Sequence, residues 1–152
     1  MTEPITADLP DTLADIARDF HELSISDRLT LLLEFSKELP ELPARYAEHP
    51  ELLEPVPECQ SPIFLLTEVD GTGPDATVRL FFSAPREAPT TRGFAGILSE
   101  GLDGMSAQAL IDVPMDLPQR LSLGEAISPL RLNGMGGMLN RIKRQVKEKA
   151  AL

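Results

Sequence analysis

The chain has 152 residues, of which 42% are hydrophobic and 25% charged, with a formal net charge of −10 and a single cysteine. At this length one globular domain buries a core that is stable without disulfides or a structural metal. The acidic excess disfavours binding to nucleic acid, and no apolar stretch approaches the ~20 residues that cross a bilayer.

Two amphipathic helices are predicted in the first forty residues. Apolar side chains recur every three or four positions over residues 13–21, which is typical of a helix with one buried face, and residues 1–11 are expected to form a flexible N-terminal segment. Ser24 with Asp27 resembles a capping box at the start of a second helix, and Pro40 ends it. Its apolar residues fall largely on one face: Leu29, Leu32, Leu33 and Leu39.

A proline-rich loop and a β-hairpin are predicted next. Residues 40–62 contain six prolines, which interrupt regular hydrogen bonding, so we expect an ordered loop with at most a short turn at 45–48. Residues 63–69 and 77–83 are rich in branched and aromatic side chains and flank a Gly-Thr-Gly-Pro-Asp sequence. They predict an antiparallel hairpin with its loop at 70–75.

Two further helices are predicted between the hairpin and residue 127. Thr90 or Thr91 can cap a helix with the apolar residues Phe94, Ile97 and Leu98, and Ser106 can cap a short helix around residues 109–110.

The last helix is predicted to begin at Ser128 and Pro129, a favourable cap and first-turn pair. One stripe of it is apolar: Met135, Met138, Leu139, Ile142 and Val146. Three glycines weaken it by about 1 kcal/mol each relative to alanine, and either permit close packing or leave room for a loop to move: Gly134, Gly136 and Gly137. The predicted class is therefore α+β, a small antiparallel sheet covered by helices on one face, in a single domain spanning residues 1–152.

The charge is distributed unevenly along the chain. Residues 131–152 carry six basic side chains and one acidic side chain, a net +5, which leaves −15 for the preceding 130 residues. The basic tail is short and lacks aromatic residues, so it does not predict a DNA or RNA site, and the acidic body favours a protein partner with a basic docking surface. The N-terminal sequence is acidic where a secretory leader is basic and then apolar, so we expect a soluble, cytoplasmic protein whose lone thiol stays reduced.

Cys59 has the most unusual sequence setting. It lies between Pro57 and Pro62, where the long loop meets the first predicted strand. Prolines restrict the backbone on both sides, so the sulfur is expected at a preorganised loop tip, which suits a nucleophile that meets another protein. Glu58 has the same charge as a thiolate and opposes ionisation, so activation must come from the fold or from the partner.

Three other interpretations of Cys59 remain open on the sequence. The thiol can be inert packing in an acidic protein-binding module, since free cysteines are commonly small core hydrophobes. A zinc site with His21 and His49 is disfavoured by the ligand spacing and the lack of a fourth ligand. A one-cysteine peroxidase is disfavoured because it needs a basic pocket, whereas the neighbour is acidic.

Four motifs resemble those of the SufE family of sulfur acceptor proteins. Cys59-Gln60-Ser61 before an apolar strand resembles the family's Gly-Cys-Gln-Ser signature. Residues 39–42 (Leu-Pro-Glu-Leu), the Arg-Gly-Phe-Ala sequence that starts at Arg92, and the Ser-Pro-Leu-Arg sequence that ends at Arg131 are similar to three further family motifs in the same order. The resemblance covers about residues 12–150.

The resemblance implies a sulfur carrier and desulfurase activator rather than a stand-alone enzyme. Such proteins accept sulfur from a SufS-like cysteine desulfurase, which carries pyridoxal phosphate, and pass it to an iron–sulfur scaffold of the SufBCD type. The implied fold is shared with IscU-type scaffolds, without a cofactor or metal of its own. Cys59 is then the persulfide carrier, and the candidate supporting residues are Gln60, Ser61, Arg92 and Arg131. For Arg92 and Arg131 an ordinary surface salt bridge is the alternative.

Three positions depart from the family pattern. Glu58 replaces the glycine that usually precedes the cysteine, Pro62 follows Cys-Gln-Ser, and Phe64 stands where tryptophan is common. Because glutamate tolerates positive φ poorly, we expect a somewhat different path for the cysteine loop. The thiol should nevertheless keep its function, which depends more on its exposure than on one neighbour.

Overall fold

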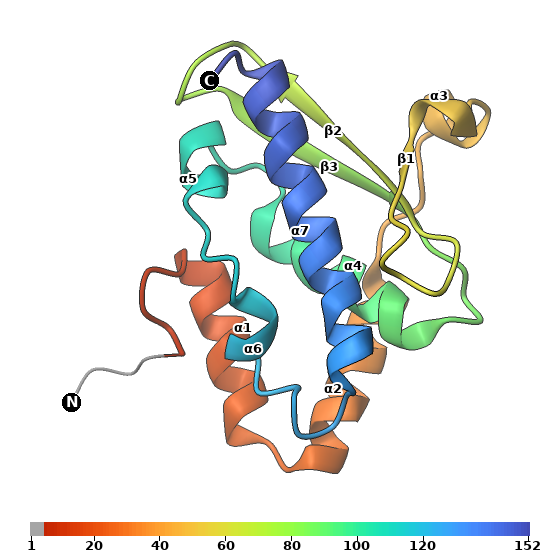
Figure 1. The fold of residues 1–152 in the computed structure, drawn as a ribbon, viewed down its shortest axis with the longest axis vertical. Coiled ribbons are helices and arrows are strands. Elements are labelled where there is room, and N and C mark those ends of the chain that lie inside the picture. The colour runs from red at the N-terminus through yellow and green to blue at the C-terminus, as the bar shows by residue number, and fades with distance from the viewer. Residues whose placement is uncertain (1–4) are drawn as a thin grey trace.

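The computed structural model describes residues 5–152 and confirms the α+β class. Helices surround a three-stranded antiparallel sheet with strand order β1-β2-β3, and α4 and α7 pack against one face of that sheet (Figure 1). Part of the predicted flexible segment, residues 1–4, lies outside the described residues, and the flexibility of the remainder stays a prediction. In the described part of this segment, the carbonyl of Ala7 accepts a hydrogen bond from Arg120.

Both predicted N-terminal helices are present, as α1 (Asp11–Glu22) and α2 (Ile25–Glu38). The hydroxyl of Ser24 accepts a hydrogen bond from the amide of Asp27 at 3.3 Å, as the capping pattern predicted. The predicted apolar face of α2 is partly wrong, because Leu29 and Leu33 are exposed.

Packing between helices decides which face of α2 is buried. Leu32 and Phe35 are the buried apolar residues of α2, and they meet Gly93 and Gly96 of α4 (Pro89–Leu102) so closely that a Cβ on either glycine would collide with backbone oxygen. A hydrophobic pattern alone does not locate this close contact.

The proline-rich segment is more regular than expected. It contains α3 (Ala44–Ala47) where a turn was predicted, a 3₁₀ turn (Pro50–Leu52), and β1 (Glu54–Pro55), which the sequence did not predict. β1 pairs antiparallel with the start of β2. Tyr46 of α3 packs against Phe81 with ring centroids 5.0 Å apart, which fixes this segment to the sheet.

The predicted hairpin is confirmed as β2 (Phe64–Asp70) and β3 (Thr77–Ser83), with Thr67 opposite Leu80 in the register. Gln145 of α7 closes part of the outer edge of β2, since its side-chain oxygen accepts hydrogen bonds from the amide of Thr67 at 2.8 Å and from its hydroxyl at 3.0 Å. The C-terminal helix is thereby registered on the sheet.

The helices predicted for the second half of the chain are all present, but the start of one differs from the prediction and one short helix was missed. α4 has no side-chain cap from Thr90 or Thr91, because Pro89 already occupies its first turn and Ala88 is the N-cap. Ser106 caps α5 (Ala107–Ile111) as predicted. The short α6 (Leu117–Arg120) was not predicted.

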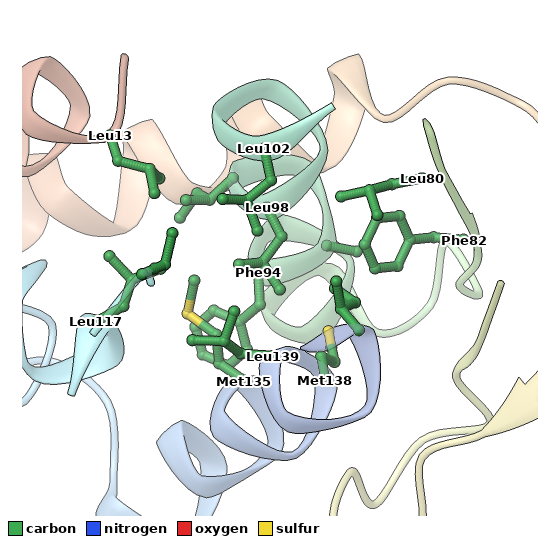
Figure 2. Close-up of a cluster of buried hydrophobic side chains, with 14 of the residues drawn as sticks. Leu13, Leu80, Phe82, Phe94, Leu98, Leu102, Leu117, Met135, Met138 and Leu139 are labelled. Carbon is green, nitrogen blue, oxygen red and sulfur yellow. The ribbon is translucent and has the colours of Figure 1, made fainter. Parts of the chain in front are cut away.

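The last helix, α7 (Pro129–Lys149), starts at the predicted cap, where the hydroxyl of Ser128 accepts a hydrogen bond from the amide of Arg131. All five residues of its predicted apolar stripe are fully buried. Figure 2 shows the resulting core, in which α4 lies at the centre and side chains of α1, α6, α7 and β3 converge on it.

Candidate functional site

Cys59 lies in a short loop, residues 56–63, that connects β1 to β2. The amide of Val56 donates to the carbonyl of Ile63 at 3.0 Å and closes the neck of this loop, and both side chains are buried. The amide of Cys59 donates to the carbonyl of Val56 at 3.1 Å. Glu58 is not among the residues with positive φ, so the loop takes a path that glutamate adopts without strain.

The sulfur of Cys59 is packed against α7. Cys59 is 9% exposed and belongs to the hydrophobic core. A Cβ at Gly134 would lie 2.9 Å from its Sγ, closer than ordinary contact, so the missing side chain makes the space in which the thiol sits. Cys59 therefore lies at a loop tip, as predicted, with its sulfur buried there, and Gly134 serves close packing.

The environment keeps the thiol protonated. Burial and, to a smaller extent, the negative charge of Glu58 raise the pKa of Cys59, Arg141 opposes both effects, and the net result is a pKa of about 11. Since only the thiolate is nucleophilic, Cys59 in this position is unreactive at neutral pH. Any reaction therefore requires the thiol to change its surroundings.

A cleft of about 260 Å³ adjoins the cysteine. Three of the candidate supporting residues line it together with Cys59, namely Gln60, Ser61 and Arg131. Arg131 is exposed, and the described part of the chain provides no ion-pair partner for its guanidinium, so the expected alternative of a surface salt bridge is not observed.

Two helices begin at this cleft. Thr90 and Thr91, in the first turn of α4, and Leu130 with Arg131, in the first turn of α7, belong to its lining. The N-terminal end of a helix carries partial positive charge and favours nearby anions, and Arg131 adds a full positive charge. Arg131 and the two helix ends therefore favour a thiolate or persulfide in the cleft, whereas Glu58 and Glu87, which also line it, oppose one.

Arg92 is placed apart from the cysteine. It is buried, and its guanidinium donates to the carbonyl of Ser36 at 2.8 Å and to that of Ala84 at 2.6 Å. Arg92 thus joins the end of α2 to the segment after β3, and it does not line the cleft. Within residues 5–152 it also has no carboxylate partner, so the alternative of a surface salt bridge is not observed, and a supporting role for Arg92 stays a prediction.

A charged network that the sequence did not predict lies behind the loop. Oε1 of Glu58 is 2.7 Å from Nη1 of Arg141 on α7, an ion pair whose alignment falls short of a hydrogen bond. Arg141 also lies 3.4 Å from Oε2 of Glu54 on β1. The Arg141 guanidinium lowers the pKa of Glu58 below its usual value. No sequence pattern pairs residues this far apart.

The zinc site that the sequence disfavoured is not assembled in the described structure. His21 contacts the hydroxyl of Ser122 and His49 pairs with Glu51, both away from Cys59. Among residues 5–152 there is no cluster of three or more histidine, cysteine, aspartate or glutamate side chains suited to a metal ion. Within the same residues, no helix combines the length and apolarity that crossing a bilayer requires.

Comparison with known proteins identifies the family to which this chain belongs. A family model described as "SufE: Fe-S metabolism associated domain" matches residues 14–146. An uncharacterized SufE-like protein of Mycobacterium tuberculosis is 55% identical over 148 residues, which cover 97% of this chain and 99% of the relative. One from Rhizobium etli is 31% identical over 127 residues, 82% of each chain. The solution structure of a hypothetical protein from Thermus thermophilus superposes with a TM-score of 0.78 at 36% identity, over 95% of this chain and 99% of that one.

Proposed function

This chain belongs to the SufE family, which is associated with iron–sulfur metabolism, and we propose that it accepts a persulfide sulfur from a cysteine desulfurase on Cys59 and delivers it to an iron–sulfur assembly scaffold. The observation that carries the proposal is the placement of the chain's only cysteine at an anchored loop tip beside a cleft where two helices begin. In this proposal the protein acts in the cytoplasm as an activator of the desulfurase.

The proposed reaction is one displacement at sulfur. The Cys59 thiolate attacks the terminal sulfur of the donor persulfide, a new S–S bond forms at Cys59, and the donor's S–S bond breaks as the donor cysteine leaves as a thiolate. No net oxidation occurs, because the transferred sulfur keeps its oxidation state. Since the chain has no second cysteine, the product cannot close an internal disulfide and must wait for an acceptor.

The position of the thiol supports a mechanism that depends on docking. In the buried position its pKa is raised to about 11, so the nucleophile forms only when Cys59 leaves α7 for a more polar site. The cleft supplies that site through Arg131 and the first turns of α4 and α7. In this mechanism, contact with the donor protein exposes the thiol, and transfer of sulfur to Cys59 follows.

The proposed partners follow from the surface and from the family. Leu130 is 60% exposed at the rim of the cleft, which offers an apolar contact to a docking protein. The desulfurase is expected to be SufS-like and to carry the pyridoxal phosphate that releases sulfur from cysteine, and the receiving scaffold is expected to be SufBCD-like. The acidic body of the chain favours a basic docking surface on such a partner.

Intact-mass spectrometry tests the carrier role directly. After incubation with a persulfide-loaded desulfurase, the wild-type chain should gain about 32 Da, the mass of roughly one sulfur atom. Cys59→Ser should bind the desulfurase but neither gain this mass nor accelerate the release of alanine. Stimulation by the serine variant equal to that by wild type would show that the chain is a binding module with a structural cysteine.

A further inference from the structure

We propose that the ion pair between Glu58 and Arg141 holds the Cys59 thiol in its buried position, so that both act as positioning residues for the sulfur acceptor. We name this pair the loop latch. The inference deepens the proposed function and rests on it for the role of Cys59, but the position of a thiol can be measured whether or not it carries sulfur.

Two contacts attach Glu58 to α7, an ion pair and close packing. Its Oε1 lies 2.7 Å from Nη1 of Arg141. Its side chain also lies over Gly137, where a Cβ would come within 2.8–3.0 Å of three Glu58 carbon atoms. Because Glu58 directly precedes Cys59, a backbone movement of the loop that carries the sulfur away from Gly134 must move Glu58 as well.

The helix half of the latch is fixed independently of the loop. Nη1 of Arg141 donates to the carbonyl of Gly137 at 3.2 Å, and its Nε lies 3.4 Å from Oε2 of Glu54. Glu54 in turn accepts a hydrogen bond from the side chain of Gln145 at 2.9 Å. Arg141 therefore remains in place when Glu58 departs, and its side chain, 18% exposed, stays ready to recapture the loop.

The loop half can move without unfolding the protein. The hydrogen bond between Val56 and Ile63 closes the neck, and both of these side chains are anchored in the core. Beyond the neck, Pro57, Gln60 and Pro62 are exposed. Rotation of the tip about this neck exposes Cys59 while the sheet and α7 keep their packing.

The rate at which the uncharged reagent iodoacetamide alkylates Cys59 measures how strongly the loop latch holds the thiol in its buried position. The rate in denaturant is divided by the rate for the same variant when folded, which gives a protection factor for Cys59. Glu58→Gln and Arg141→Gln should each lower this factor by roughly three- to tenfold, and the double variant should lower it no further, because both changes break one interaction. Glu148→Gln is the matched control, since it removes one carboxylate from an ion pair with Arg144 on the same helix, away from the loop.

Two readouts separate the latch from a general loss of structure or a change in thiol acidity. Raising the salt concentration should lower the protection factor of wild type but not that of Glu58→Gln, because only an ion pair is screened. Hydrogen exchange of peptides covering residues 56–63 should accelerate in Glu58→Gln, also in a Cys59→Ser background where no thiol titrates.

Unchanged protection and exchange in Glu58→Gln would overturn the latch, as would equal salt dependence in wild type and variant. If Arg141→Gln fails to fold, the Glu58→Gln and salt measurements decide alone. A sulfur adduct on Cys59 with unchanged protection in Glu58→Gln contradicts the latch only. Faster alkylation in Glu58→Gln without any adduct from a loaded donor contradicts the carrier role only.

Discussion

Gly134 of α7 provides a direct test of how the thiol is accommodated, and Gly136 is its control. Both glycines lie inside the same helix, where replacement by alanine stabilises the helix by about 1 kcal/mol through backbone entropy. At Gly136 an added Cβ has no neighbour within 4 Å among the described residues, so Gly136→Ala should raise the free energy of unfolding by about 1 kcal/mol.

At Gly134 the same methyl group meets the cysteine. It would lie 2.9 Å from Sγ and 3.5 Å from Cα of Cys59, whereas unstrained contacts are about 3.5–4.0 Å. Overpacking of this kind costs about 1–3 kcal/mol, which offsets or exceeds the helical gain. Gly134→Ala should therefore be about 1–3 kcal/mol less stable than Gly136→Ala.

The loop can relieve this clash by leaving α7, which makes alkylation the decisive assay. Urea unfolding of both variants gives the free energies, and iodoacetamide labelling of the folded proteins gives the exposure of Cys59. We expect Gly134→Ala to be alkylated severalfold faster than wild type and Gly136→Ala at the wild-type rate. Equal stability of the two variants together with equal labelling would refute the idea that Gly134 makes the space for the thiol.

Two further predictions concern helix packing and pH. Gly96→Ala should lower the free energy of unfolding by about 2–3 kcal/mol, because the added Cβ would collide with the carbonyl oxygen of Phe35 and separate α2 from α4. A loss below about 1 kcal/mol in chemical denaturation would show that α2 and α4 do not pack this closely. The pKa of Cys59 is raised from 9.0 to about 11, so the folded protein keeps a proton that the unfolded chain loses between pH 9 and 11, and stability falls as the pH rises through this window. The fall should reach about 2–3 kcal/mol relative to Cys59→Ser, and parallel pH–stability curves for the two proteins would rule it out.

The elements that local chemistry specifies were predictable from the sequence. Ser24, Ser106 and Ser128 each cap a helix as predicted, because a hydroxyl that accepts from an amide three residues later is a local interaction. The hairpin followed from two segments rich in branched and aromatic residues around a glycine-containing turn. The last helix followed from the spacing of the five residues of its apolar stripe, all of which are buried.

The misplaced elements depend on contacts between distant segments. β1 is two residues long and contains a proline, so it has no periodicity, and it exists because β2 offers it a partner. The buried face of α2 differs from the predicted one because Gly93 and Gly96 of α4 admit Leu32 and Phe35 closely, leaving Leu29 and Leu33 exposed.

The candidate site was also only partly predictable from the sequence. Cys59 could be identified because it is the only thiol and lies between prolines, and Gln60, Ser61 and Arg131 followed from the family resemblance. Arg92 belongs to a similar motif, yet its bonds to backbone carbonyls show that a motif does not locate a side chain. The partnership of Glu58 with Arg141 required the fold, since it joins a loop to a helix near the other end of the chain.

Burial of Cys59 serves two requirements at once. A pKa of about 11 in place of 9.0 lowers the thiolate fraction about a hundredfold at neutral pH, so the closed loop protects the sulfur from alkylating agents and oxidants. The same shift means that ionisation favours the open loop, because the thiolate gains more from contact with solvent than the thiol does. In the proposed mechanism, exposure and activation of the thiol are therefore coupled, and a docking partner that stabilised the open loop would need no separate base on this chain to generate the thiolate.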